Sequence, residues 1–242
     1  MSEINSSELI QFRDMVKRFL DKEIKPYYEQ WEKDGLIPRE VWHSMGANGL
    51  LAVDLPEEYG GCGVSYLYSM AILEEASYAN FGSLATGLSV HSDIAAPYVL
   101  HIGNEAQRQQ WLPKMASGEV IGAIAMTEPG AGSDLQAIRT TAILSGDHYV
   151  LNGSKIFITN GYLCDMAVVV AKTGTSEKGA QNISLLLVDA HSEGFSKGKP
   201  LKKVGMKGQD TCELFFNNVK VPKANLLGME GMGFIMLMKE LA

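Results

Sequence analysis

The sequence predicts a multi-domain α and β protein: an all-helical amino-terminal domain over residues 1–117, then an antiparallel β-barrel or sandwich over residues 118–230. Apolar residues in the first half recur at steps of three and four, the period of a helix that packs on one face. Near residue 118 the pattern changes to short β-branched runs separated by turn residues. A chain of 242 residues that is 46% hydrophobic can bury a full core in such domains.

The first predicted helix carries one apolar stripe, made of Leu9, Phe12, Val16, Phe19, Leu20 and Ile24. Asn5, with Glu8 three residues later, has the residue types of a capping pair and would begin this helix. Pro38 can open a second helix that ends near Gly49, because proline is tolerated in a first helical turn. Further helical patterns cover residues 65–79, 83–101 and 104–116, with a loop over residues 56–63.

Seven strands are predicted in the second domain, over residues 120–126, 140–144, 148–151, 155–159, 166–172, 183–189 and 211–217. Residues typical of hairpin turns stand between several of them, at Ser145-Gly146-Asp147, Asn152-Gly153 and Asn160-Gly161. Short strands at this spacing favour an antiparallel barrel or sandwich, with a hairpin at each of these turns.

A last helical pattern begins after Gly231, and its apolar stripe consists of Phe234, Leu237, Met238 and Leu241. Residues 231–242 are therefore interpreted as the start of a carboxy-terminal helical domain that is otherwise missing from the chain. We expect the stripe to lack a cover, so that this end frays or pairs with a second copy. Folding back onto the β domain is the less expected outcome, because that domain has a core of its own to fill.

Charge and composition exclude several classes of function. The formal net charge of −7 disfavours nucleic acid and anionic membranes as partners, although residues 197–207 hold five lysines. No apolar run approaches the roughly 18 residues that a membrane span requires. Three widely separated cysteines without a CxxC pattern indicate free thiols and a cytoplasmic location. His91 and Asp93 are the one close pair with metal-ligand chemistry, and no metal site is predicted.

The segment 125–137, AMTEPGAGSDLQA, is the strongest candidate for chemistry. It offers hydroxyl groups at Thr127 and Ser133, and backbone amides from Gly130 to Asp134 that the loop can leave free. Successive amides of this kind form a concave donor site for an anion or a carbonyl oxygen. The alternative is an ordinary turn after a strand, and the residues by themselves favour that reading.

This segment resembles the first signature of the acyl-CoA dehydrogenase family at every position. Three more matches follow in order: NGSKIFITNG from residue 152, GMKGQDTCELFFNNVKVP from residue 205 and LLGMEGMGF from residue 226. The likeness covers essentially the whole chain. The residues in these segments, including QDTCELFF and MKEL, are most similar to the long-chain branch of the family.

The resemblance implies FAD-dependent oxidation of an acyl-CoA thioester to the trans-2-enoyl-CoA. The first flavin-binding strip would be Ile124, Ala125, Met126, Thr127, Glu128, Pro129, Gly130, Ala131, Gly132 and Ser133, and the second Phe157, Ile158 and Thr159. Amides near Met126 and the Thr127 hydroxyl would serve the pyrimidine edge of the flavin, where reduction places negative charge. Phe157 would pack on the flavin ring, and the Thr159 hydroxyl would approach N5. Ile158 is also expected as plain strand core.

The same resemblance implies that Ser133 contacts the CoA portion of the substrate, with Ala180 and Gln181 near it. It also implies an electron-transferring flavoprotein as acceptor and a homotetramer. The family takes its catalytic glutamate from the carboxy-terminal helical domain, beyond Ala242, so no catalytic residue is assigned and the 242-residue chain is expected to be an inactive fragment. Alternatives are an acyl-CoA oxidase, a flavin monooxygenase on the same fold and a non-catalytic binding module.

Overall fold

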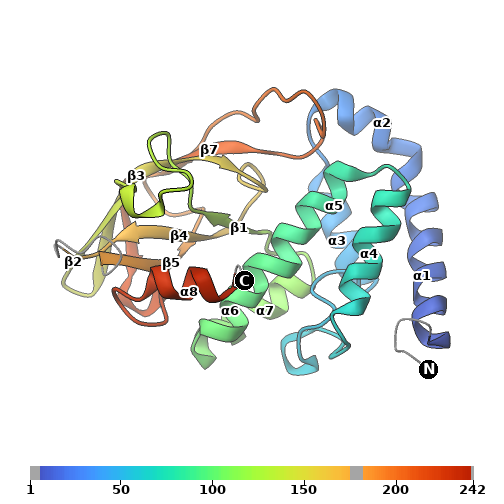
Figure 1. The fold of residues 1–242 in the computed structure, drawn as a ribbon, viewed down its shortest axis with the longest axis horizontal. Helices are drawn as coiled ribbons and strands as arrows, with labels where there is room; N and C mark the ends of the chain where they lie inside the picture. The colour runs from blue at the N-terminus through green and yellow to red at the C-terminus, as the bar shows by residue number, and fades with distance from the viewer. Residues whose placement is uncertain (1–5, 175–181, 241–242) are drawn as a thin grey trace.

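The computed structural model describes residues 6–174 and 182–240, and places a group of helices beside an eight-stranded sheet (Figure 1). The α-helices are α1 (Ser7–Phe19), α2 (Lys25–Asp34), α3 (Arg39–Ala47), α4 (Leu67–Tyr78), α5 (Gly82–Ser89), α6 (Ala96–Ile102), α7 (Glu105–Ala116) and α8 (Gly233–Glu240). The strands are β1 (Gly122–Ala125), β2 (Thr141–Ser145), β3 (His148–Ile158), β4 (Met166–Lys172), β5 (Ile183–Asp189), β6 (Phe195–Lys197), β7 (Cys212–Pro222) and β8 (Leu226–Leu227). The predicted order, helices first and a β domain second, is confirmed.

Two of the predicted long helices are interrupted by single π-helical turns. Residues Leu20–Ile24 join α1 to α2 in this way, and Val90–Ala95 join α5 to α6. The first helix begins one residue later than predicted, because the Ser6 side chain accepts the Leu9 N–H at 3.2 Å. The prediction of Asn5 as the cap was therefore wrong, since a serine directly before the first turn satisfies the same amide.

The sheet is mixed, which corrects the expectation of a purely antiparallel one. Its strands follow the order β6-β7-β3-β2-β4-β5-β8, and β1 lies beside β4 off this path. β1 pairs with β4 in parallel, and Thr141 of β2 pairs with Lys172 of β4 in parallel, whereas the other pairings are antiparallel. A long connection between β1 and β4 contains the β2–β3 hairpin, and such a connection lets the chain return in the same direction.

Two predicted strands are in fact one, since β3 runs unbroken through Asn152-Gly153. This dipeptide forms an irregularity instead of a hairpin: Asn152 Oδ1 accepts the N–H of Asn218, which has a φ of 54° on the opposing strand. The predicted hairpin at Gly146 is confirmed by the pairing of β2 with β3. The turn at Asn160-Gly161 exists, but it leads into β4, which does not pair with β3. Strands β6 and β8 were not predicted.

The central strands β4 and β5 are covered on both faces, which explains their nearly continuous burial. Met166, Val168 and Val170 face a core that includes residues of α6 and α7. Ala167 and Val169 face a second core within the sheet domain, shared with β3 and β7. A third core fills the group of helices from α1 to α5.

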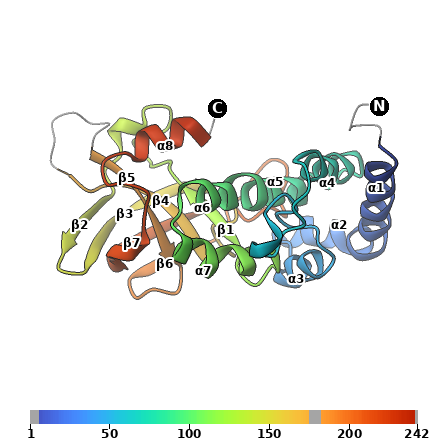
Figure 2. The same cartoon turned by 90° about the horizontal axis from the view of Figure 1, so that it is seen from below.

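Helix α8 lies on the sheet domain beside α6, as both views show (Figure 2). Leu237 is fully buried there, Phe234 is partly buried in the same core, and the Tyr98 hydroxyl donates to the Leu237 carbonyl at 3.4 Å. The expectation that this stripe lacks a cover was wrong for these two residues, because α6 and β5 leave a place for the helix. Met238 remains exposed, and Leu241 lies outside the described residues.

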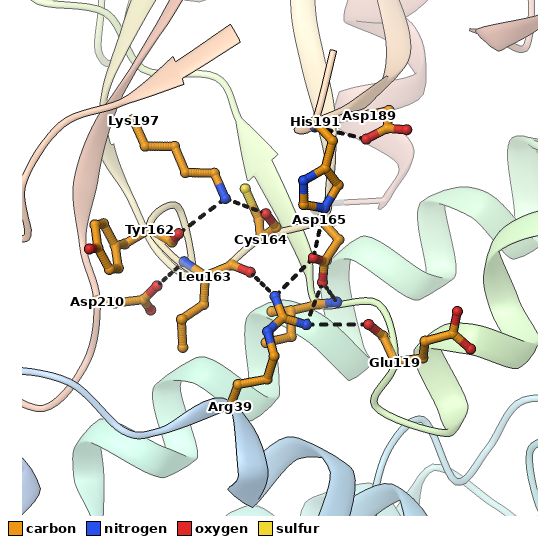
Figure 3. A network of polar contacts seen from close by, with 12 residues as sticks. Arg39, Glu119, Tyr162, Leu163, Cys164, Asp165, Asp189, His191, Lys197 and Asp210 are labelled. Carbon is orange, nitrogen blue, oxygen red and sulfur yellow. Dashed lines mark hydrogen bonds and ion pairs between the residues drawn. The ribbon is translucent and has the colours of Figure 1, made fainter.

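The two domains are joined by a polar network at the start of β4 (Figure 3). Arg39 of α3 donates to both carboxylate oxygens of Asp165, at 2.9 and 2.8 Å, and to the Leu163 carbonyl at 2.6 Å. Asp165 also accepts the N–H of Ile121, directly before β1, at 2.8 Å. The Leu163 N–H donates to Asp210. One charged cluster therefore fixes the entry of β1 and the turn before β4.

Candidate functional site

The segment 126–134 and the end of β3 lie side by side in the structure. The Ile156 N–H donates to the Thr127 carbonyl at 2.9 Å, although the two residues belong to separate predicted motifs. Glu128 and Ala131 exchange two backbone hydrogen bonds, which close the loop into a tight turn at Pro129. The sheet therefore brings together the two strips that the sequence singled out.

A buried ion pair fastens the two strips to each other. Lys155 Nζ donates to Glu128 Oε1 at 2.8 Å and to the Met126 carbonyl at 2.9 Å. The Lys155 side chain is fully buried and that of Glu128 nearly so. The Glu128 carboxylate also accepts the N–H groups of Arg139 and Thr140, at 2.6 and 3.0 Å. Both buried charges thus have hydrogen-bond partners within the protein.

The pKa values of the pair follow from this arrangement. Burial lowers the pKa of Lys155 to about 8, against the opposing effect of Glu128. Burial would raise the pKa of Glu128, but hydrogen bonds from Lys155, Thr140 and Arg139 outweigh it, and the pKa of Glu128 is lowered. The carboxylate is therefore ionised at neutral pH and engaged by internal donors, so it is not available as a base.

Phe157 is the residue of this region in the least ordinary conformation. Its φ of 60° is in the left-handed range, which is costly for a bulky side chain, and the residue is 63% exposed. A shift in register between Lys155 and Ile158 accompanies this conformation and turns the ring out of the sheet. Strained backbone that presents an apolar ring to the surface is characteristic of binding sites.

Several hydrogen-bond donors beside Phe157 have no partner among the residues that the structure describes. They are the backbone amides of Met126, Thr127, Gly130, Gly132, Ser133 and Asp134, and the hydroxyls of Thr127, Ser133 and Thr159. Gly130 and Gly132 have no described atom within 4 Å of the position of a Cβ, so the loop borders open space. Free amides, free hydroxyls, an exposed ring and room for a ligand fit a planar aromatic group with polar edges.

The far end of the second strip is held just as firmly. Asn160, with a φ of 60°, is buried and donates to the carbonyls of Gly87 on α5 and Gly122 on β1, at 2.8 and 3.2 Å. Lys197 Nζ reaches the carbonyls of Tyr162 and Cys164 in the next turn (Figure 3). Phe157 and Thr159 therefore lie between two rigid anchors, Lys155 before them and Asn160 after them.

The sequence-predicted residues occupy different positions in this site. Ile124 and Ala125 are in β1, and Ala125 is fully buried. Ala131 and Ile158 are buried as core, as the alternative for Ile158 anticipated. The exposed members of the loop are Pro129, Gly130, Gly132 and Ser133. Ala180 and Gln181 lie outside the described residues, so their predicted contact with substrate is not placed.

Lys155 was not predicted as part of the site, although the sequence held a signal for it. Tyr149 and Leu151 are buried on the inner face of β3, and the two-residue period of a strand places Lys155 on that same face. A lysine at an inward position requires a buried partner, and Glu128 is that partner.

The described helices are too short or too polar to cross a membrane, and no cluster of metal-ligating side chains occurs among the described residues. Two family models match the chain: "Acyl-CoA dehydrogenase, N-terminal domain" over residues 6–119 and "Acyl-CoA dehydrogenase, middle domain" over residues 123–219. The chain belongs to the acyl-CoA dehydrogenase family.

Members of the acyl-CoA dehydrogenase family resemble the chain over nearly all its length. The chain is 49% identical over 239 residues to the long-chain specific acyl-CoA dehydrogenase, mitochondrial, of Rattus norvegicus. This match covers 98% of this chain and 55% of the relative. An acyl-CoA dehydrogenase structure from Geobacillus kaustophilus matches all of this chain and 63% of its own, with a TM-score of 0.96 and 48% identity. One from Bacillus anthracis, complexed with FAD, matches all of this chain and 41% of its own, with a TM-score of 0.91 and 36% identity. The chain thus spans about half the length of its curated relative.

Proposed function

We propose that the protein carrying this chain oxidises acyl-CoA thioesters, with a long acyl chain, to trans-2-enoyl-CoA with FAD as cofactor. The observation that carries the proposal is Phe157, an exposed ring at a φ of 60° beside a row of free donors. The identity with a long-chain relative supports the choice of substrate. When bound, FAD would supply the hydride acceptor for the reaction.

Three groups of residues would hold the flavin. The Phe157 ring offers a flat apolar face on which an aromatic ring system can stack. The amides of Met126 and Thr127 and the hydroxyls of Thr127 and Thr159 are free to donate to its polar edges. Donors that are fixed before the reaction stabilise negative charge as it develops, without the cost of reorientation. Ile124 to Ser133 and Phe157 to Thr159 are accordingly the proposed flavin contacts.

The substrate contacts are proposed from the same loop. Ser133 carries a free hydroxyl and a free amide at the exposed tip, where both can reach the CoA portion. Ala180 and Gln181 are proposed beside it. The proton of the substrate needs a positioned carboxylate. Glu128 is engaged by Lys155, and Asp134 accepts the Gln136 N–H at 3.2 Å. We therefore propose that the base comes from outside this chain and that the 242 residues alone do not turn over.

An electron-transferring flavoprotein is the proposed acceptor, and a homotetramer the proposed assembly. Free cysteines support a reducing, cytoplasmic location: Cys62 is exposed, and Cys164 and Cys212 are buried without a disulfide.

The test is anaerobic addition of a long-chain acyl-CoA to the FAD-loaded whole protein that carries this chain together with its base, and not to the 242 residues alone. Bleaching of the flavin absorbance together with formation of the trans-2-enoyl-CoA is the expected result. Rapid reoxidation by oxygen with release of hydrogen peroxide would instead indicate an oxidase, and an oxygenated product a monooxygenase. A flavin spectrum that no acyl-CoA changes would contradict the proposal.

A further inference from the structure

Lys155 makes two kinds of contact that differ in consequence. Its ion pair with Glu128 satisfies two buried charges, as any buried pair must. Its second hydrogen bond, to the Met126 carbonyl at 2.9 Å, fixes the orientation of the peptide between Met126 and Thr127. The carbonyl and the N–H of a trans peptide point in opposite directions. Since the carbonyl points inward to Lys155, the Thr127 N–H is directed away from the buried amine.

The next peptide, between Thr127 and Glu128, is held as well. The Thr127 carbonyl accepts the Ile156 N–H at 2.9 Å, and the Glu128 N–H donates to Ala131 at 2.9 Å. Lys155 is thus central to a set of bonds around Thr127, yet the Thr127 amide and hydroxyl have no partner among the described residues. Phe157 follows two residues after Lys155 on the same strand. The fully buried amine thus bonds to the segment that carries the free donors and belongs to the strand that carries the exposed ring.

We infer that Lys155 is a positioning residue, which through the Met126 carbonyl aligns the Thr127 donors with the Phe157 ring so that both engage one flavin. This inference rests on the proposed function, because it takes FAD as the ligand. Lys155 itself is shielded from the site, so its effect on the flavin passes through the loop. The Glu128 carboxylate keeps the amine buried but makes no contact with the Met126 carbonyl.

The experiment separates the two contacts of Lys155 by substitution. In Glu128→Gln, the amine loses its ionic partner but still donates to Met126, since a neutral amine remains a donor. In Glu128→Gln/Lys155→Met, both charges are removed together, so that no unpaired charge stays buried, and the bond to Met126 is lost as well. Lys203→Met is the matched control, because Lys203 also donates to a backbone carbonyl, that of Gln209, outside the site.

FAD affinity is measured by titration of flavin absorbance, and folding by circular dichroism and thermal denaturation. We expect Lys203→Met to bind FAD within about threefold of wild type, and the double variant to bind about tenfold or more weakly than Glu128→Gln while it remains folded. The flavin reduction potential should shift in the double variant, which a purely structural role would not cause. Should the double variant not fold, Lys155→Leu in the Glu128→Gln background removes the same donor with a side chain of a different shape.

Equal FAD affinity and equal potential in the double variant and in Glu128→Gln would overturn the inference and leave the proposed function intact. A wild-type protein that does not bind FAD would overturn the proposed function, and the inference with it.

Discussion

Arg39, at the first turn of α3, donates hydrogen bonds to both carboxylate oxygens of Asp165, which lies 126 residues later at the start of β4. The same carboxylate accepts the Ile121 N–H before β1, and His191 Nε2 lies 3.2 Å from it (Figure 3). A planar guanidinium suits this two-point contact, which a lysine cannot reproduce. The helical domain is thereby fixed to the strand that leads into the candidate flavin loop.

Arg39→Met should destabilise the protein by about 2 to 3 kcal/mol, because Asp165 would keep its mostly buried charge without its main partner. Chemical denaturation measures the loss. Arg18→Met is the control: Arg18 is exposed and pairs with no described residue, so this variant should stay within about 0.5 kcal/mol of wild type. Equal stability of the two variants would show that the two hydrogen bonds from Arg39 to Asp165 contribute nothing to stability.

His91 predicts an acid-dependent loss of stability. It is fully buried between the Gly122 N–H, 3.0 Å from Nδ1, and the Met115 carbonyl, 3.0 Å from Nε2. Burial lowers the pKa of His91 from 6.5 to about 4, although Met115 and Asp165 favour the charged form. Between these values the unfolded chain binds the proton and the folded one does not, so His91 lowers stability as pH falls, by at most about 1.4 kcal/mol per pH unit.

His91→Gln isolates this effect, since glutamine can accept and donate in the same place without titrating. The comparison is needed because burial raises the pKa of Asp93 and of Asp210 to about 6, and these groups oppose the effect of His91. Denaturation from pH 7.5 to 4.5 should show the advantage of wild type over the variant shrinking below about pH 6.5. A constant difference across this range would rule out a neutral, buried His91.

Phe157→Gly should not destabilise the protein. Its free energy of unfolding should equal that of wild type or exceed it by up to about 1 kcal/mol. Glycine adopts a positive φ without strain, which offsets its greater entropy in the unfolded chain, and the exposed ring has little packing to lose. Asn160→Gly is the matched control at the same φ of 60°. Because Asn160 is buried and bonded to Gly87 and Gly122, its variant should be clearly destabilised in thermal denaturation. The reverse order of the two variants would contradict this account of Phe157.

Gly132→Ala should weaken FAD binding by about tenfold, or about 1.4 kcal/mol, with no change in melting temperature. No described atom lies within 4 Å of the added methyl group, so any effect must come from a ligand that occupies that space. Gly46→Ala provides the contrast, because a Cβ there would overlap the Ser117 carbonyl and should disrupt folding. Unchanged FAD affinity in Gly132→Ala would show that FAD does not occupy the space beside Gly132.

Periodicity predicted the order of elements well, and the ends of β4 and β5 were predicted correctly because their apolar runs are bounded by turn residues. The pairing of the strands was harder to predict from the sequence. The dipeptide Asn152-Gly153 suits a hairpin and a strand irregularity equally, and only the opposing Asn218 selects the second. The ion pair of Lys155 with Glu128 was missed for a similar reason, since its two residues are 27 positions apart and meet only through the fold.

Titration of FAD into the purified chain, followed by flavin absorbance, tests the central claim most directly. Wild type should show saturable binding of one FAD per chain with the spectral shift of a stacked flavin, and Phe157→Gly, although folded, should bind about tenfold or more weakly. Absence of binding by wild type, or equal binding by the two proteins, would contradict the assignment of this loop and ring as a flavin site.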